Sequence, residues 1–534
     1  MHRPPAILRT HPGPRLAAVL SVLLVAGVFF TGWLHPRVVD PTSIGWLLDG
    51  EDRGQNAAGL TAYLRAPPVW PSTRQTLLSA PEGASLLLTD SNPLVGLLLR
   101  PVAGFLPAGL QFTGLWLLAC VVLQAFFAWK LLRPHASDDV AAALATLLLA
   151  AAPVLINRAG HPNLCAHWLI LWALWIYLDP VRARRPAHWA AVLGLAALVH
   201  SYLLLMVAAV WATAMLRAAV REPDRLRLLG SAVLVVAVVA VLLSLHGLSG
   251  ERFESTGSFG RFAMTLDAWW SPSSGNFEGL QYLGAGLLML CAVAAWATWR
   301  GLIGADARAM LRHLAWLLPA FAVLGLLALG NEWMWRGRVV ASVTLPRGAT
   351  DLLDPIRAAG RLFWPATYTL SFVATALTLR LPRARFLLAG ACAIQLANLL
   401  PFIASVRAGS AAAADTTSFR RTADPRWASM IAHAGSVAFH PADPSLDLAL
   451  VEEVQWRAII ACRPTAMTYT ARRAKATRDR LAQEERAFQA GRVDPTRLYI
   501  LLDQGPAWAR ARIRTIDGVR FIPPIRAAPP PGCG

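Results

Sequence analysis

The sequence predicts a polytopic α-helical membrane protein with about 11 transmembrane helices, a long first outer loop and a small C-terminal α/β domain. Three observations predict this class. Of the 534 residues, 56% are hydrophobic and only 15% are charged, whereas soluble domains average about 25% charged residues. Apolar runs of about 20 residues, the length that crosses a bilayer, recur along the chain. Basic residues gather at the ends of these runs.

The apolar runs define the candidate spans. The first run, residues 16–34, resembles a signal peptide, but it is long enough to span and many runs follow it. A longer stretch, residues 187–217, is interrupted at His200 and is basic at both ends, so we expect a hairpin of two short helices that turns near His200. The other candidate spans are residues 109–132, 139–156, 163–178, 228–245, 279–298, 313–329, 362–379 and 385–405.

The distribution of basic residues predicts the orientation. A formal net charge of +19 is compatible with nucleic-acid binding, but here the arginines flank apolar segments, so we expect no nucleic-acid partner. The positive-inside rule places the N-terminus, with Arg3, Arg9 and Arg15, in the cytoplasm. Residues 35–108 and the whole tail after residue 405 then lie outside.

The first outer loop has elements of its own. Residues 52–65 predict an amphipathic helix that is ended by the prolines at positions 67, 68 and 71. The apolar stretch 94–106 would be about 20 Å long as a helix. Because this is too short to cross a core of about 30 Å, we expect it to lie in the membrane interface or to dip into the membrane.

After the membrane domain, residues 1–405, the composition becomes that of a soluble domain. Strand-like runs at 436–439, 498–502 and 519–522 alternate with helical runs at 448–461 and 474–490, which predicts an α/β domain over residues 411–526. We expect the proline-rich and glycine-rich residues 527–534 to be disordered. Cys462 and Cys533 could form a disulfide if this domain faces an oxidising compartment.

An acidic cluster, Asp49, Glu51 and Asp52, follows the first span. Carboxylates elsewhere also gather at the outer ends of the predicted spans. Ion-coupled transporters usually place carboxylates near the bilayer midplane, so this distribution favours chemistry at the outer surface. The alternative interpretation is a solvated helix N-terminus, at which carboxylates are favoured by the helix dipole.

Two short motifs carry a resemblance to a known class of enzymes. They are GEDRGQ at residues 50–55 and TDSNPL at residues 89–94. The first motif follows the first span, and the second leads into a juxtamembrane helix. In this arrangement they resemble motifs of the GT-C superfamily of integral membrane glycosyltransferases, with distant similarity to protein O-mannosyltransferases and lipid A aminoarabinose transferases. The second motif departs from the mannosyltransferase pattern Asp-x-His-Pro-Pro-Leu, with Ser-Asn-Pro in place of His-Pro-Pro. Residues 14–405 are also similar to an uncharacterised bacterial family grouped with GT-C enzymes.

The resemblance implies a GT-C-like fold and a hexosyltransferase-like activity. A sugar would move from a polyprenyl-phosphate donor to a lipid or polysaccharide acceptor, at the periplasmic face of the bacterial inner (plasma) membrane. It also implies a catalytic carboxylate in the first loop, which we carry over to Asp52, with Glu51 or Asp49 as alternatives. This carboxylate would accept the proton of the acceptor hydroxyl.

A leaving polyprenyl phosphate requires cationic groups that stabilise its developing charge. Arg357 and Arg361 are four residues apart, and we expect both side chains on one helix face at the outer end of a span. The alternative is that they extend to lipid headgroups. Polar residues at the outer turns are further candidates for binding phosphate or sugar, although such residues also satisfy turns and freed backbone groups. These candidates are Asp90, Asn92, His161, Asn163, His167, His200, Tyr202 and Arg261.

The sequence predicts no cofactor. The six cysteines lack the spacing of a zinc site. Some GT-C enzymes bind a divalent cation through acidic residues, so Asp49, Glu51 and Asp52 could hold one. Two other functions remain open. A lipid or polysaccharide transporter would need a continuous polar path through the helices, and a non-catalytic membrane scaffold would use the C-terminal domain only to bind partners.

Overall fold

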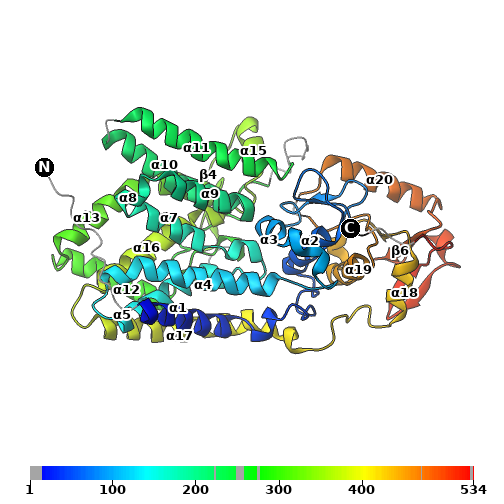
Figure 1. Cartoon of the computed structure of the whole chain (residues 1–534), viewed down its shortest axis with the longest axis horizontal. Helices are drawn as coiled ribbons and strands as arrows, with labels where there is room; N and C mark the ends of the chain where they lie inside the picture. Colours follow the sequence, from blue (N-terminus) through cyan, green and yellow to red (C-terminus); the bar gives the residue numbers. More distant parts are fainter. Residues whose placement is uncertain are drawn as a thin grey trace.

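The membrane-type helices run along the long axis of the molecule, and the C-terminal domain caps one end of them (Figure 1). The computed structural model describes residues 15–221, 224–247, 258–272, 277–470, 472–529 and 533. Arg3 and Arg9, which were used to predict the orientation, lie outside the described residues. Within the described part, six helical segments are long and apolar enough to cross a membrane. Three are the single helices α10 (Ser201–Arg221), α11 (Arg225–Ser244) and α17 (Ala384–Ala408), and a fourth, Leu16–Trp33, lies within α1 (Arg15–Trp33). The other two include a 3-10 turn: Thr113–His135 consists of α4 (Thr113–Leu132) and η3 (Arg133–His135), and Ala305–Leu329 consists of α13 (Ala305–Leu314), η7 (Ala315–Leu317) and α14 (Leu318–Leu329).

Other predicted spans form shorter apolar helices. They are α5 (Asp139–Ala150), α7 (Trp168–Tyr177), α9 (Pro186–Val199), α12 (Ala285–Trp299) and α16 (Trp364–Thr378). Each is shorter than the roughly 20 residues that span a bilayer core. The class is therefore a helical membrane protein, while a total of about 11 complete spans stays a prediction.

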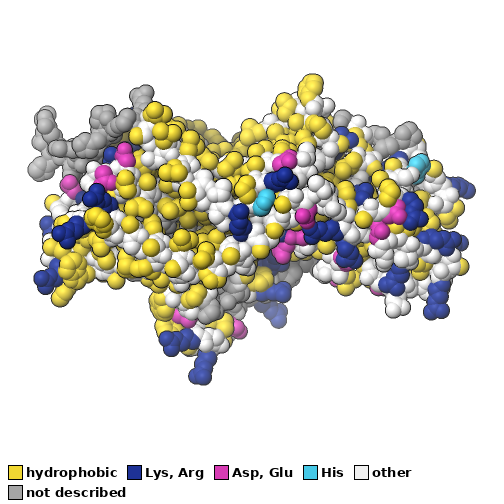
Figure 2. Space-filling view, turned by 90° about the horizontal axis from the view of Figure 1, so that it is seen from below, with side chains coloured by type: hydrophobic (Ala, Val, Ile, Leu, Met, Phe, Trp, Pro, Cys, Tyr) yellow, Lys and Arg dark blue, Asp and Glu magenta, His cyan; other side chains and the backbone are white. Residues whose placement is uncertain are grey.

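The surface agrees with this class. Only Val235 is buried along the 20 residues of α11, and Leu226 and Val241 are 83% and 64% exposed. Figure 2 shows hydrophobic side chains over much of the membrane-type part, with arginine and lysine gathered toward the two ends. Apolar side chains exposed over whole helices indicate contact with lipid.

The hairpin predicted at His200 is present. Helix α9 ends at Val199, His200 has an extended backbone (φ −165°, ψ 135°), and α10 starts at Ser201. The first turn of α9 and the last turns of α10 line one cavity through Trp189 and Arg217. The two helices are therefore antiparallel, and both basic ends lie on the same side of the molecule.

Helix α2 (Asp52–Arg65) has the predicted bounds but is not amphipathic. Every residue from Arg53 to Tyr63 is buried, because α2 packs against α3 (Pro93–Leu99), α4 and α19 (Leu448–Ile460). Two glycines permit these contacts: an added Cβ at Gly54 would lie 2.4 Å from Glu452 Cδ, and one at Gly59 would lie 2.1 Å from Ser91 Oγ. Helix α3 continues into the 3-10 helix η2 (Arg100–Phe105), so the predicted short apolar helix is confirmed.

The predicted C-terminal α/β domain is confirmed, with a four-stranded sheet in the order β5-β6-β8-β7. Strands β5 and β6 are parallel, and β8 is antiparallel to both β6 and β7. The short strand β7, which has no buried residue, was not predicted. The elements are β5 (Ser436–His440), β6 (Arg497–Leu501), β7 (Arg514–Ile516), β8 (Val519–Ile522), α18 (Arg426–His433), α19 and α20 (Lys475–Gln489).

A buried carboxyl group joins this domain to the first outer loop. Glu452 on α19 accepts a hydrogen bond from the Gly50 backbone N–H at 2.8 Å. Burial raises the pKa of Glu452 to about 9, and the carboxylate of Asp49 acts in the same direction. Glu452 is therefore protonated at neutral pH, which lets it lie between two elements without an ion pair.

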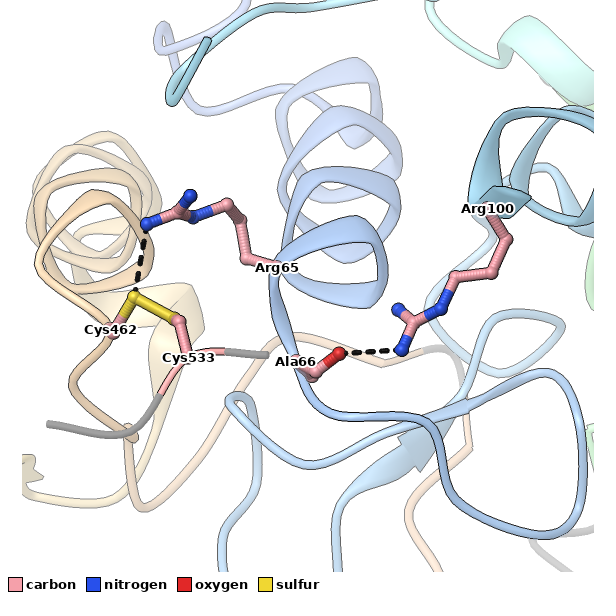
Figure 3. Close-up of a disulfide and its surroundings, with 5 residues drawn as sticks. All are labelled: Arg65, Ala66, Arg100, Cys462 and Cys533. Atoms are coloured by element: carbon pink, nitrogen blue, oxygen red, sulfur yellow. Dashed lines mark hydrogen bonds between the residues drawn. A yellow bond between two sulfur atoms is a disulfide. The ribbon is translucent and has the colours of Figure 1, made fainter. Parts of the chain in front are cut away.

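The C-terminal tail is tied to the same region, as Figure 3 shows. Cys462 and Cys533 form a disulfide with 5.8 Å between their Cα atoms, and Arg65 at the end of α2 donates to Cys462 Sγ at 3.1 Å. The backbone N–H of Ala528 also bonds to His433 O at 3.0 Å. The expectation of disorder was therefore wrong for the described residues of the tail, because the disulfide and these bonds hold them.

Candidate functional site

Asp52 is the first residue of α2, in the segment between α1 and α3. Its side chain is 33% exposed, and its Oδ2 lies 3.0 Å from Nδ1 of His161. Nε2 of the same ring lies 3.0 Å from Oε1 of Glu278. His161 therefore bridges two carboxylates, one of them partly open to solvent and the other buried.

Glu278 is the centre of the charged network. It lies in the 3-10 helix η6 (Phe277–Gly279) and receives two bonds from Arg361, Nη2 to Oε1 at 2.5 Å and Nε to Oε2 at 2.7 Å. Arg158 forms a second ion pair with Oε2. Burial by itself would raise the pKa of Glu278, but Arg361, His161 and Arg158 outweigh it and hold that pKa far below its ordinary value. Glu278 is thus an anion that joins its own segment to two others, the segment of Arg158 and His161 and the segment of Arg361.

Asp90 is held by its backbone as well as by its side chain. Its φ is +51°, a conformation that aspartate tolerates better than most residues. The Asp90 carbonyl accepts bonds from the side-chain amides of Asn56 at 2.5 Å and Asn163 at 2.8 Å. Nε2 of His200 lies 3.5 Å from Asp90 Oδ1. Burial would raise the pKa of Asp90, but the hydrogen bond and charge of His200 lower it overall, so Asp90 stays ionised.

The two arginines expected on one helix face lie in different surroundings. Arg361 belongs to the 3-10 helix η8 (Ala359–Phe363) and turns inward to Glu278, whereas Arg357 precedes η8, with its guanidinium 5.6 Å from the ring centre of Phe262. The prediction of a shared face was wrong because Asp354–Ala358 forms a turn and no helix. Tyr202 Oη accepts a bond from the Ala358 N–H at 2.9 Å and supports this turn.

The C-terminal domain contributes two side chains. Arg472 donates to the Asp354 carbonyl and lies 3.6 Å from Asp354 Oδ2. Burial raises the pKa of Tyr469, Asp52 and Asp90 raise it further, and Arg357 lowers it. Tyr469 therefore lies within electrostatic range of Asp52, Asp90 and Arg357, three of the residues that the sequence analysis proposed for the site.

Other candidates of the acidic loop have different surroundings. Asp49 forms an ion pair with Arg53, and Glu51 is an exposed residue immediately before α2. Asn92 Oδ1 accepts a bond from the Val95 N–H at 3.2 Å and caps α3, and its expected role in binding substrate stays a prediction.

Two further candidates have surroundings of a different kind. His167 is fully buried, with Nδ1 2.9 Å from Tyr368 Oη and its ring centre 4.1 Å from that of Trp364. These contacts give His167 a role in packing, and its expected role in binding substrate stays a prediction. Arg261 lines a separate cavity of about 920 Å³ together with Asp267.

The sequence analysis missed Glu278, Arg158, Tyr469 and Arg472. Glu278 could have been proposed on the same ground as Asp49, because it is a carboxylate next to the predicted outer end of an apolar run. Arg158 follows such a run directly. Tyr469 and Arg472 had no signal, because their partners are brought to them only by docking of the C-terminal domain.

The acidic loop was also a candidate for binding a divalent cation. Asp49 is turned to Arg53, and Asp52 to His161. Within the described residues, no group of three or more His, Cys, Asp or Glu side chains is arranged to hold a metal ion. The geometry of the described loop thus offers a network of ion pairs.

The bridging histidine predicts a pH dependence of stability. Burial by itself would lower the pKa of His161, but hydrogen bonds to Asp52 and Glu278 outweigh it and raise that pKa above 6.5. Its stabilising contribution is therefore complete below about pH 6.5 and is lost as the pH rises through the raised pKa. We expect the stability advantage of the wild type over His161→Gln, measured by thermal unfolding in detergent, to shrink from about pH 6 to pH 9.

The comparison with His161→Gln is needed because loss of the Glu452 proton also lowers the stability of the protein as the pH rises. The pKa of Glu452 is raised from 4.5 to about 9, so the wild type and the variant both lose this stabilisation as the pH rises through that range. Only the difference between the two proteins reports on His161. Parallel pH profiles would contradict the charged bridge.

Comparisons with known proteins place the chain in a family. No curated protein matches it. Residues 426–524 match a domain described as the DUF6311 C-terminal domain, which agrees with the sheet and helices observed there. Residues 23–400 match a second, larger domain that covers the membrane helices and the charged network. Because this match extends over more than half of the chain, the protein belongs to the family described as domain of unknown function (DUF6311).

Proposed function

We propose that this protein is a glycosyltransferase of GT-C type. It moves a sugar from a polyprenyl-phosphate donor to a lipid or polysaccharide acceptor, at the periplasmic face of the bacterial inner membrane. The observation that carries the proposal is geometric: Oδ2 of Asp52 lies 3.0 Å from His161, whose other ring nitrogen lies 3.0 Å from Glu278. Asp52, Asp90 and Arg357 also all act electrostatically on one side chain, Tyr469. A base, a second carboxylate and a cation near each other at the end of the helices are what such a transfer requires.

Asp52 is the best placed of the three acidic residues to act as the base. Its carboxylate is partly exposed and its orientation is held by His161 at 3.0 Å, whereas Asp49 is paired with Arg53. In the proposed reaction Asp52 accepts the proton of the acceptor hydroxyl as that oxygen attacks the anomeric carbon of the sugar. The bond from the anomeric carbon to the phosphate oxygen breaks, and its electron pair leaves with the polyprenyl phosphate.

Arg357 is better suited than Arg361 to stabilise the leaving phosphate. Arg361 is occupied by two bonds to Glu278. Within the described residues, the side chain of Arg357 makes no ion pair, and it is only partly buried over the ring of Phe262. A guanidinium that is free to form two parallel bonds with a phosphate stabilises its charge more than a neutral donor does. Arg361 then acts as a positioning residue, through Glu278 and His161.

The C-terminal domain supports the proposal because it closes over one side of the network. Tyr469 and Arg472 come from this domain. The bonds from Gly50 to Glu452 and from Arg65 to Cys462 keep the domain against the first outer loop. We assign the domain a role in selecting the acceptor. A phenol within electrostatic range of Asp52 can donate a hydrogen bond to a sugar or to an acceptor hydroxyl.

The test is sugar transfer by the purified protein in lipid nanodiscs. Polyprenyl phosphates that carry radiolabelled hexoses or pentoses would be supplied with a membrane-lipid extract as acceptor, and extractable label would be followed by chromatography. We expect label to move to an acceptor with release of polyprenyl phosphate, and no transfer from nucleotide sugars. Transfer that needs only a nucleotide sugar would contradict the proposal, as would movement of intact donor across the bilayer without cleavage.

A further inference from the structure

A basic cavity lies at the end of the helices opposite the charged network. It has a volume of about 290 Å³ and is enclosed by the first turns of α9 and α11 and the last turns of α10. Helix α10 starts next to His200, which faces Asp90, and its 21 residues correspond to about 30 Å. The part of α10 that lines the cavity, residues 211–221, is the half of the helix away from His200, and none of the lining residues belongs to the charged network.

Arginine dominates the polar lining of this cavity. Arg184, Arg217, Arg221 and Arg227 contribute to it, together with Asp224. Oδ1 of Asp224 accepts a bond from the Arg227 backbone N–H at 3.0 Å and caps α11. The described lining thus carries an excess of positive charge, and its chemistry suits an anion with several oxygen acceptors, such as a phosphate group.

An apolar groove continues from the basic cavity. It has a volume of about 620 Å³, runs between α10 and α11, and shares Met215 and Leu228 with the cavity. Its other apolar side chains include Leu216, Val220 and Leu229, which are 56%, 65% and 60% exposed. Both helices are long and apolar enough to cross a membrane, so this groove opens toward the hydrocarbon region of the bilayer.

We propose that the cavity and the groove together bind one anionic phospholipid, with its phosphate among the arginines and an acyl chain between α10 and α11. A charged pocket joined to an apolar channel matches the two halves of such a molecule, and a soluble anion would use only the first half. Basic pockets between membrane helices are known places for acidic lipid headgroups. The positive-inside rule assigns this end to the cytoplasmic leaflet, where anionic lipids are abundant.

Native mass spectrometry of the purified protein tests the headgroup site. Phosphatidylglycerol would be titrated into the delipidated protein, with phosphatidylcholine as the neutral lipid. The test variant is Arg221→Gln with Arg227→Gln, and the matched control is Arg300→Gln with Arg312→Gln, which removes two exposed arginines outside the cavity. We expect the apparent Kd for the first bound phosphatidylglycerol to rise at least tenfold in the test variant, because each basic residue near a membrane contributes about fivefold.

The acyl-chain groove is tested by filling it. Ala232→Trp places a large ring in the groove, and Val233→Trp places the same ring on the 58% exposed surface of the same helix. We expect Ala232→Trp to weaken phosphatidylglycerol binding by roughly tenfold and Val233→Trp to leave it unchanged. The proposal would be overturned if both arginine variants bound phosphatidylglycerol equally well. It would also be overturned if the protein bound inorganic phosphate or polyprenyl phosphate more tightly than phosphatidylglycerol. These readouts are independent of sugar transfer.

Discussion

Replacing Asp52 with asparagine is expected to lower the rate of sugar transfer by about 10²–10⁴-fold, the usual contribution of a positioned general base. Asparagine has the same shape, and its amide oxygen can still accept a bond from His161, which lies 3.0 Å from the carboxylate of the wild type. It cannot take the proton of the acceptor hydroxyl. We therefore expect turnover to fall while the donor still binds and the protein stays folded.

The transfer assay proposed above measures this effect, with Asp351→Asn as the matched control. Asp351 is an exposed carboxylate on α15 (Arg347–Leu353), and its substitution removes the same charge outside the network. Wild-type turnover by Asp52→Asn would contradict the assignment of the base. Loss of turnover in Glu51→Gln with full activity in Asp52→Asn would move the base to Glu51.

The sequence was sufficient for those features that depend on local physical chemistry. The bounds of α2 were predictable because prolines follow its last turn, and the hairpin at His200 because both flanks are basic. The environment of α2 was not predictable. Its burial depends on Glu452, which is 402 residues from its partner Gly50, and on glycines whose close contacts only the folded chain defines.

The candidate site was predictable to a similar extent. Asp52, Asp90 and Arg357 could be proposed from motifs and from their places at the predicted outer ends of helices, and all three act electrostatically on Tyr469. The prediction that Arg357 and Arg361 share one helix face was wrong. Residues four apart lie on one face only within an α-helix, and this segment is a turn followed by η8. Spacing also cannot predict an ion pair such as Arg361–Glu278, whose members are 83 residues apart.

Removal of the Glu278 charge is expected to have the largest effect on stability. The side chains of Arg158 and Arg361 are 1% and 10% exposed, and Glu278→Gln would leave both guanidinium groups buried without their anion. Removing one member of a buried ion pair typically costs about 3–5 kcal/mol. We expect a loss of this size in the free energy of unfolding, measured by denaturant titration in mixed micelles.

Two further variants distinguish a lost ion pair from a lost side chain. Glu332→Gln, the matched control, changes an exposed glutamate of the strand β3 (Glu332–Trp335) and is expected to stay within about 0.5 kcal/mol of the wild type. Adding Arg158→Met to Glu278→Gln should recover part of the loss, because one of the two unneutralised charges is then gone from the interior. If the double variant is instead less stable than Glu278→Gln by the full cost of Arg158→Met alone, the two residues act independently. Glu278 would then stabilise the fold through packing, and His161 and Asp52 would owe their positions to other contacts.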